Sequence, residues 1–340
     1  MNINLPRLPI AHLPTPLEPL PRLSTELGPR IFIKRDDQTG LAGGGNKTRK
    51  LEFLVADALA APRKADTLIT VGAPQSNHAR QTAAAAAKFG LRCILVLRGD
   101  APPEATGNLL LDHLLGAQVI WSGKRSREEV MEEVAEEEKA AGRHPYPVPL
   151  GGSTPLGAAA YALAMVELKE QMEANNLSFD RIIFASSSGG THAGLVVGAG
   201  LTGFRGEVLG ISVDENLETL RNTVARLATE TAALLGQPRT YTRQDISANT
   251  DYLGAGYAVM GKPEREAIEL FAQTEGILVD PVYTGRAAAG MIDLIRRGLI
   301  RKNETILFWH TGGTPALWAY AEQLVSGRSI ERPDVILLQT

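Results

Sequence analysis

Lys47 follows three consecutive glycines, Gly43 to Gly45, and precedes apolar residues that recur at helical spacing. The segment before the glycines, residues 31–35, is rich in β-branched and aromatic residues and is typical of a strand. We therefore expect a glycine loop that ends at a helix, with Asn46 as the N-cap and Lys47 in the first turn. The positive end of a helix dipole disfavours an ammonium there. Lys47 thus suits chemistry that needs a free amine, such as Schiff base formation; the alternative is a loop that caps a surface helix with solvated lysines.

A second polar loop, residues 72–78, follows another expected strand. Ser76 suits the N-cap of the next helix, which is a sufficient structural role for that one residue. Gln75, Asn77 and His78 add more polar groups than a cap requires. Side chains and backbone N–H groups at a helix start can together hold a carboxylate.

A third loop, Ser186-Ser187-Ser188-Gly189-Gly190-Thr191-His192, lies between an expected strand and an apolar helix. Glycines allow backbone N–H groups to converge, and the helix dipole favours an anion. The loop lacks the lysine of nucleoside-triphosphate loops and the Gly-x-Gly-x-x-Gly spacing of dinucleotide loops. A phosphate monoester fits best, and the alternative is a serine-rich turn. A Schiff-base lysine together with a phosphate-monoester loop is what pyridoxal phosphate (PLP) requires.

Two further loops, residues 280–285 and 310–315, are also expected at strand-to-helix junctions, where open α/β sheets bind ligands. Either is compatible with a plain connection. Tyr283 in the first of them and Tyr257 farther upstream, each taken alone, are more typical of packed aromatic residues than of catalysts.

Strands and helices alternate along most of the chain, after an N-terminal segment of residues 1–28 that reads as extended and rich in proline. This alternation predicts parallel sheets with helices on both faces. The expected strands are residues 31–35, 67–71, 92–97, 117–121, 146–150, 181–185, 208–213 and 305–309, and the expected helices include residues 77–88, 107–115, 125–141 and 155–174.

Composition excludes several classes of protein. The 340 residues carry 35 Lys+Arg and 38 Asp+Glu, so no basic excess suggests a nucleic-acid or membrane partner. The single cysteine, Cys93, excludes an internal disulfide and a cysteine-based zinc cluster and is expected in a buried strand. No His/Asp/Glu spacing indicates a metal site. No segment reads as a signal peptide or approaches the roughly 18 apolar residues of a membrane span, so a cytoplasmic protein is expected.

Five motifs in one order closely resemble the family of D-cysteine desulfhydrases and 1-aminocyclopropane-1-carboxylate (ACC) deaminases, which includes L-cysteate sulfo-lyases. The likeness extends from about Leu13 to Tyr320. The motifs are Gly44-Gly45-Asn46-Lys47-Thr48-Arg49-Lys50, Gln75-Ser76-Asn77-His78, Gly189-Gly190-Thr191-His192, Asp280-Pro281-Val282-Tyr283-Thr284-Gly285 and His310-Thr311-Gly312-Gly313.

The resemblance implies a tryptophan-synthase-β-like PLP enzyme of fold type II, with two three-layer αβα domains and largely parallel sheets. The large PLP domain would comprise residues 1–50 and 157–340, and the smaller domain residues 51–156. A homodimer is also implied, with a small amino acid as substrate.

The resemblance also implies roles for individual residues. Lys47 would form the Schiff base, and Ser76 and Tyr283 would assist proton transfer. The substrate would be bound by Ser76, Asn77, His78, Tyr257 and Tyr283. The cofactor would be held by Lys47, Lys50, Asn77, Ser188, Gly189, Gly190, Thr191, Thr284 and Thr311.

Two positions separate the activities within the family. ACC deaminases carry Glu where this chain has Thr284 and Leu where it has Thr311, so the chain departs from the deaminase pattern and matches the desulfhydrases. The prediction is α,β-elimination from D-cysteine, giving pyruvate, sulfide and ammonia. L-cysteate sulfo-lyase is the alternative, with a leaving-group cation expected from Arg80, His78 or the loop at residues 98–100. ACC deaminase, a non-catalytic PLP-binding protein and a nucleotide-binding α/β protein are the others.

Overall fold

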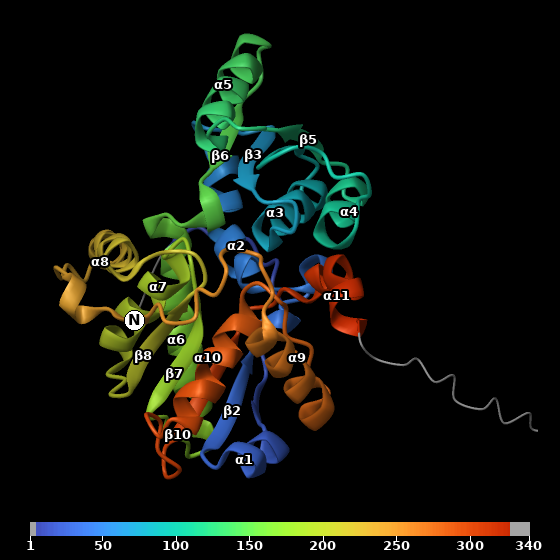
Figure 1. The fold of residues 1–340 in the computed structure, drawn as a ribbon. Helices are drawn as coiled ribbons and strands as arrows, with labels where there is room; N and C mark the ends of the chain where they lie inside the picture. Colours follow the sequence, from blue (N-terminus) through green and yellow to red (C-terminus); the bar gives the residue numbers. More distant parts are fainter. Residues whose placement is uncertain (1–4, 327–340) are drawn as a thin grey trace, which may run out of the picture.

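The computed structural model describes residues 5–326, and their strands form two separate sheets (Figure 1). The larger sheet has six strands in the order β1-β2-β10-β7-β8-β9. Only β1 and β2 pair antiparallel; the other neighbours are parallel. In order along the sheet, the strands are β1 (Leu17–Pro19), β2 (Arg30–Arg35), β10 (Thr305–His310), β7 (Arg181–Ser186), β8 (Glu207–Ser212) and β9 (Ser247–Asn249).

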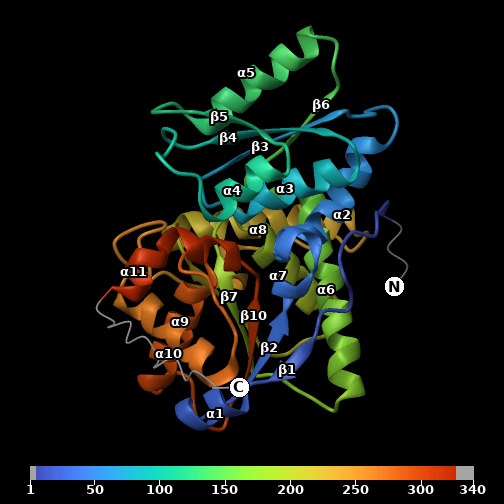
Figure 2. The ribbon, with the colours of Figure 1, turned by 90° about the vertical axis from the view of Figure 1, so that its right-hand side faces the viewer.

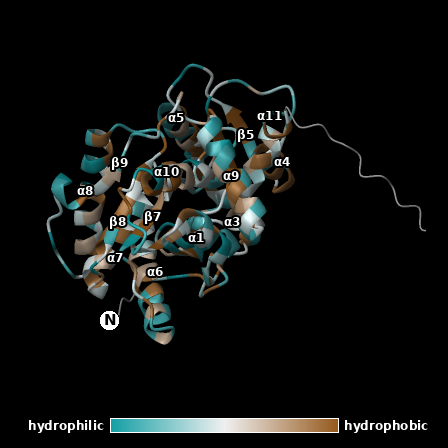
Figure 3. Ribbon diagram, turned by 60° about the horizontal axis from the view of Figure 1, so that its bottom comes forward, coloured by the Kyte–Doolittle hydropathy of each residue, from teal (hydrophilic) through white to brown (hydrophobic). Residues whose placement is uncertain are grey.

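Helices cover both faces of this sheet, which completes three layers (Figure 2). One face carries α6 (Pro155–Ala174), α7 (Gly190–Thr202) and α8 (Leu217–Leu234), and the other carries α1 (Pro21–Leu27), α9 (Lys262–Glu275) and α10 (Thr284–Arg296). The strands between these layers are hydrophobic, whereas the outer α8 mixes hydrophobic and hydrophilic residues (Figure 3). Near-continuous apolar strands are what a parallel sheet buried on both faces requires.

The smaller sheet has four parallel strands in the order β5-β4-β3-β6. They are β5 (Gln118–Trp121), β4 (Arg92–Leu97), β3 (Thr67–Gly72) and β6 (Pro145–Val148). One face packs against α2 (Asn46–Leu59), α3 (Asn77–Lys88) and α4 (Gly107–Leu114), and the other against α5 (Arg127–Ala140). Cys93 is buried in β4, as predicted.

Short 3-10 helices complete the connections. They are η1 (Asp36–Gln38), η2 (Leu41–Gly43), η3 (Leu150–Gly152), η4 (Arg243–Asp245) and η5 (Thr314–Tyr320), and η5 leads into α11 (Ala321–Val325). Within residues 5–326, no helix combines the length and hydropathy needed to cross a membrane.

The sequence predicted most elements to within two or three residues, and α6 and β4 have the predicted bounds. Three predictions were wrong. Residues 21–27 form α1 and are not extended, because Pro21 is preorganised for the first helical turn and Leu23 is buried in the core. Asn46 is the first residue of α2, whose N-cap is Gly45. No strand precedes the loop of residues 280–285, which connects α9 to α10.

The division into residues 51–156 and the rest of the chain remains a prediction. The four strands of the smaller sheet lie between residues 67 and 148, and α2, which carries Lys47, continues across position 51. Residues 1–4 and 327–340, which the prediction assigned to the large domain, lie outside the described residues.

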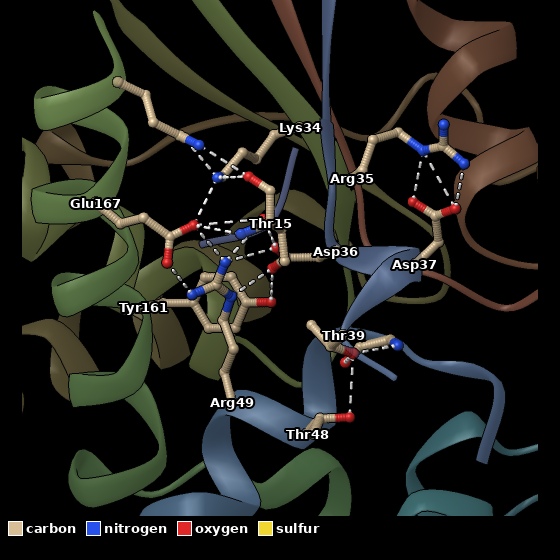
Figure 4. Close-up of polar contacts among 12 residues, drawn as sticks. Thr15, Lys34, Arg35, Asp36, Asp37, Thr39, Thr48, Arg49, Tyr161 and Glu167 are labelled. Carbon is tan, nitrogen blue, oxygen red and sulfur yellow. Dashed lines mark hydrogen bonds and ion pairs between the residues drawn. The ribbon is translucent and has the colours of Figure 1, made fainter. Parts of the chain in front are cut away.

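A buried ionic network fixes α2 against β2 and α6 (Figure 4). The guanidinium of Arg49 donates to both carboxylate oxygens of Asp36, at 2.9 and 3.0 Å, and to both of Glu167, at 2.8 and 2.9 Å. Lys34 Nζ donates to Glu167 at 2.6 Å, and the Tyr161 hydroxyl donates to Asp36 at 2.6 Å. Burial alone would raise the pKa of Asp36, but Arg49, Lys34 and Tyr161 hold it below its usual value.

Arg49→Met should lower the free energy of unfolding by about 3–5 kcal/mol, because it leaves two buried carboxylates with Lys34 as their remaining cation. Urea unfolding at neutral pH measures the loss. Arg226→Met is the control: Arg226 forms an exposed pair with Glu230 on α8, and its removal should cost about 1 kcal/mol or less. Equal losses in the two variants would contradict a stabilising role for the network.

Candidate functional site

One cavity is lined by residues from all five of the polar loops that the sequence singled out. Lys47 lies at the start of α2, and Ser76, Asn77 and His78 lie at the start of α3. The remaining lining residues lie in η3, in the turn from β7 into α7, after α9 and after β10; they are Asn46, Leu150, Gly151, Ala185, Ser186, Ser187, Ser188, Gly189, Thr191, His192, Tyr283 and Thr311. Cavities at the carboxyl ends of parallel strands are the usual ligand sites of α/β folds.

Lys47 presents a primary amine to this cavity. It is half-buried, and its Nζ donates to the side-chain oxygen of Asn46 at 2.9 Å. Burial lowers the pKa of Lys47 to about 8, against the nearby Asp280 carboxylate, which raises it. A substantial fraction of this amine is therefore unprotonated near neutral pH, as a nucleophile or a general base needs.

Asn46 does more than the expected capping. Its backbone N–H donates to the Thr311 carbonyl at 2.9 Å, and its amide nitrogen donates to Thr191 Oγ1 at 3.0 Å. The residue thus ties the lysine loop to the loop after β10 and to the start of α7. The sequence interpretation missed this role because only the fold brings these three segments together.

The serine-glycine loop after β7 has the geometry of an anion site. Gly189 has a φ of +85°, and α7 begins at Gly190 with its first N–H groups turned toward the loop. A Cβ on Gly190 would lie 3.0 Å from the amine of Lys50 and 2.7 Å from Ser153 Oγ. The absence of a side chain at this position therefore lets a buried cation approach the helix N-terminus.

Lys50 lies behind this loop, one turn along α2 from Lys47. It is buried, and its Nζ donates to the Gly151 carbonyl at 3.0 Å. Burial, and then the proximity of Lys47, lower the pKa of Lys50 well below its usual value. A phosphate at the start of α7 would stabilise the charged form of Lys50, so the donor set fits the phosphate monoester predicted from the sequence.

Ser153 was another residue that the sequence interpretation missed, since residues 151–153 read only as a turn. Its hydroxyl accepts from the Gly190 N–H at 3.1 Å and donates to Ser188 Oγ at 2.8 Å. The η3 segment thereby holds two residues of the anion loop in place.

The loop before α3 supplies neutral polar groups. Ser76 caps α3 as predicted, and its hydroxyl accepts from the Ala79 N–H at 3.2 Å. Thr70 gives its hydroxyl proton to the Val148 carbonyl, so His78 Nε2 must donate to Thr70 Oγ1, at 2.7 Å. Burial, followed by Lys47 and Lys50, lowers the pKa of His78 well below its usual value, so the imidazole is neutral.

Of the three candidate cations for a leaving group, none faces the cavity as a charge. His78 lines the cavity but is neutral, and Arg98, exposed at the end of β4, is not among the lining residues. Arg80 is buried and donates to the carbonyls of Ala42 and Gly44. Arg80 thus holds the glycine loop before Lys47 and does not line the cavity.

Two tyrosines meet at the other side of the cavity. The hydroxyls of Tyr257 and Tyr283 are 2.5 Å apart, and their rings pack edge to face. Tyr283 lines the cavity, and Tyr257 stands behind it. Burial raises the pKa of Tyr257 to about 12 and raises that of Tyr283 further, so both carry their protons at neutral pH.

Thr284 and Thr311 occupy different positions relative to the cavity. Thr311 lines it, whereas Thr284 is buried beneath Tyr283 at the start of α10. The Thr284 hydroxyl donates to Asp280 Oδ1 at 2.7 Å and accepts from the Asp280 N–H at 2.9 Å. Within residues 5–326, no cluster of three or more His, Cys, Asp or Glu side chains is arranged to hold a metal ion.

Comparisons with known proteins agree with this geometry. The family described as "Pyridoxal-phosphate dependent enzyme" matches residues 9–312. A D-cysteine desulfhydrase of Klebsiella pneumoniae (strain 342) is 45% identical over 94% of this chain and 97% of its own length. A putative 1-aminocyclopropane-1-carboxylate deaminase of Pyrococcus abyssi is 42% identical over 94% of this chain and 95% of its own length.

Solved structures give the same result for the fold. The crystal structure of an ACC deaminase homologue has a TM-score of 0.87 and 40% identity, and the match covers 95% of this chain and 96% of that one. The processed form of threonine deaminase isoform 2 from Solanum lycopersicum, at 16% identity, has a TM-score of 0.65 over 92% of this chain and 82% of its own. The predicted fold, with αβα layers around largely parallel sheets, is confirmed.

Proposed function

Since the chain belongs to the family of pyridoxal-phosphate dependent enzymes, we propose that it converts D-cysteine and water into pyruvate, sulfide and ammonia. The observation that carries this proposal is the near-complete match, at 45% identity, to a protein named D-cysteine desulfhydrase. The family and the PLP cofactor are those that the sequence predicted. Bound PLP supplies an aldehyde that condenses with amines and a ring that withdraws electrons from Cα.

We propose that the cofactor lies in the cavity with its phosphate at the start of α7. Ser188, Gly189, Gly190 and Thr191 would bind the phosphate, with Lys50 as the counter-ion behind them. Lys47 would bond to the aldehyde carbon, Asn77 would face the ring's 3-hydroxyl, and Thr311 would lie near the ring nitrogen. Thr284 would act there through its bond to Asp280.

The proposed chemistry needs one base and one acid. Lys47, released as a free amine when the substrate binds, takes the Cα proton, and its lowered pKa of about 8 suits that task. Ser76, Asn77 and His78 bind the substrate carboxylate with neutral donors at the start of α3. Tyr283, which remains protonated, gives a proton to the departing sulfur and is recharged through Tyr257; Ser76 is the alternative donor.

The two competing substrates fit the chain less well. A carboxylate at position 284 would lie against Asp280, whereas the neutral Thr284 hydroxyl leaves the ring nitrogen less protonated, which suffices for a good leaving group but not for opening a cyclopropane. L-cysteate releases a sulfonate-derived anion, and none of its three candidate cations faces the cavity as a charge. D-cysteine is therefore preferred over both.

A side-by-side assay of D-cysteine, L-cysteine, L-cysteate and ACC tests this function. The PLP-loaded protein should release pyruvate and sulfide fastest from D-cysteine. Sulfite from L-cysteate with slow turnover of D-cysteine would make the protein a sulfo-lyase, and ammonia from ACC without sulfide chemistry would make it a deaminase. No pyruvate from any of them would favour a non-catalytic PLP-binding protein.

The rate at which PLP loads onto the cofactor-free protein should rise with pH and level off above about 8, because only the unprotonated Lys47 amine attacks the aldehyde. Stopped-flow absorbance from pH 6 to pH 10 measures this dependence, with a free amine such as N-acetyl-lysine, whose pKa is about 10.4, as the reference. A midpoint equal to that of the free amine would mean that burial does not lower the pKa of Lys47.

We also propose a homodimer, which the family resemblance implies, in the cytoplasm. Light scattering after gel filtration should give twice the chain mass of 36.4 kDa. A mass of one chain at micromolar concentration would refute the dimer.

A further inference from the structure

The start of α4 is fastened to the loop that carries Asn77, and α4 packs beside α3 (Figure 2). The backbone N–H of Asn108 donates to Gln75 Oε1 at 2.9 Å, and Gln75 Nε2 donates to the Thr106 carbonyl at 2.9 Å. A Cβ on Gly107 would lie 2.3 Å from Gln75 Oε1, so the two segments are in close contact. Neither Asn108 nor Gln75 is in the cavity lining.

The side chain of Asn108 is completely buried and makes two hydrogen bonds. Its amide nitrogen donates to the Gln75 carbonyl oxygen at 3.0 Å and to Asn77 Oδ1 at 3.0 Å. Its own Oδ1 has no hydrogen-bond partner within residues 5–326. A buried amide that leaves its oxygen unpaired while its nitrogen serves two acceptors is held for the sake of the nitrogen.

These contacts fix which way round the two amides stand. A backbone carbonyl only accepts, so the Asn108 atom that faces Gln75 must be the nitrogen. The same nitrogen faces Asn77, so the Asn77 atom that meets it must be the oxygen. The Asn77 nitrogen, with two protons to donate, is thereby left for the cavity that Asn77 lines.

We propose that Asn108 is a positioning residue, which orients the Asn77 amide so that a donor faces the ring oxygen of the cofactor. This inference rests on the proposed placement of PLP against Asn77. A donor at that oxygen stabilises its deprotonated form and withdraws charge from the ring. The nitrogen that joins Lys47 to the cofactor then binds its proton less tightly.

Asn108→Asp is the sharpest test, because it keeps the shape and replaces the only donor with an acceptor. Asn77 can then bond to residue 108 only by turning its nitrogen toward it, which points its oxygen at the cofactor. The midpoint of the pH titration of the bound cofactor's visible absorption should rise by about one pKa unit, and the apparent Kd for PLP should increase about tenfold. Asn108→Ala, which leaves Asn77 free to adopt either orientation, should give a smaller rise.

A double-mutant cycle separates this role from a merely structural one. In an Asn77→Ala background, Asn108→Asp should shift the titration no further, although its contacts with Gln75 change as before. Asn108→Ala completes a second cycle with Asn77→Ala if the aspartate variant does not fold. Asn175→Asp, an exposed asparagine at the end of α6, is the control and should leave the titration and the Kd unchanged.

Two results would overturn the proposal: wild-type titration and PLP affinity in both Asn108 variants, or full-sized shifts that persist without the Asn77 amide. These readouts need no amino-acid substrate. A protein that failed to act on D-cysteine would refute the proposed reaction and leave this test intact.

Discussion

Lys47→Ala should abolish the release of pyruvate from D-cysteine, with a loss of at least about 10³-fold, because the variant lacks both the amine that binds the cofactor and the base that takes the Cα proton. The same substitution should remove the absorption shift that accompanies condensation of PLP with an amine. Because Lys50 and the start of α7 remain, PLP should still bind, reversibly, through its phosphate.

Lys169→Ala is the matched control for this prediction. Lys169 is exposed on α6 and pairs only loosely with Glu173, at 3.8 Å, so turnover and the PLP spectrum should be those of the wild type. Near-normal pyruvate release from the Lys47 variant would mean that another group, or no covalent attachment at all, carries the reaction.

The sequence predicted the parts of the site whose signals are local. Three glycines before an amphipathic segment placed Lys47 in the first turn of α2, and a serine before an alanine-rich segment placed the N-cap of α3. Apolar runs bounded by turn residues were enough to place the parallel strands, because such strands are buried on both faces. Each of these inferences needed only about ten neighbouring residues.

The remaining features depend on contacts between distant segments. Arg80 looked available for a substrate anion, yet the fold turns it toward the carbonyls of residues 42 and 44. The N-cap preference of Asn46 gave no sign that its side chain would reach Thr191, 145 positions away. Asn108 lies in an ordinary short helix and carried no signal at all. Hydrogen-bond partners of this kind cannot be read from spacing along the chain.

The carboxylate of Asp280 is the second group whose removal should have a large effect. It is completely buried and accepts from the backbone N–H groups of Val282, Tyr283 and Thr284, at 2.9, 2.8 and 2.7 Å. It also accepts from the Thr284 hydroxyl. One side chain therefore satisfies the donors that begin α10 and sets the position of Tyr283 in the cavity.

Asp280→Ala should lower the free energy of unfolding by about 3 kcal/mol or more, because several buried donors lose their only acceptor. Urea unfolding measures the loss. Asp251→Ala, which removes an exposed carboxylate, should change the free energy by about 0.5 kcal/mol or less. A loss no larger than that of Asp251→Ala would show that the loop holds its shape without the carboxylate.

Asp280→Asn separates the electrostatic role from the structural one. It retains one acceptor oxygen and the side-chain volume but removes the charge that raises the pKa of Lys47. The pH midpoint for loading PLP should therefore move below about 8, in the direction of a more acidic amine, while the stability falls less than in the alanine variant. An unchanged midpoint would assign Asp280 to the geometry of the Tyr283 loop alone, whereas a lowered midpoint would mean that the same carboxylate also sets the protonation of the catalytic amine.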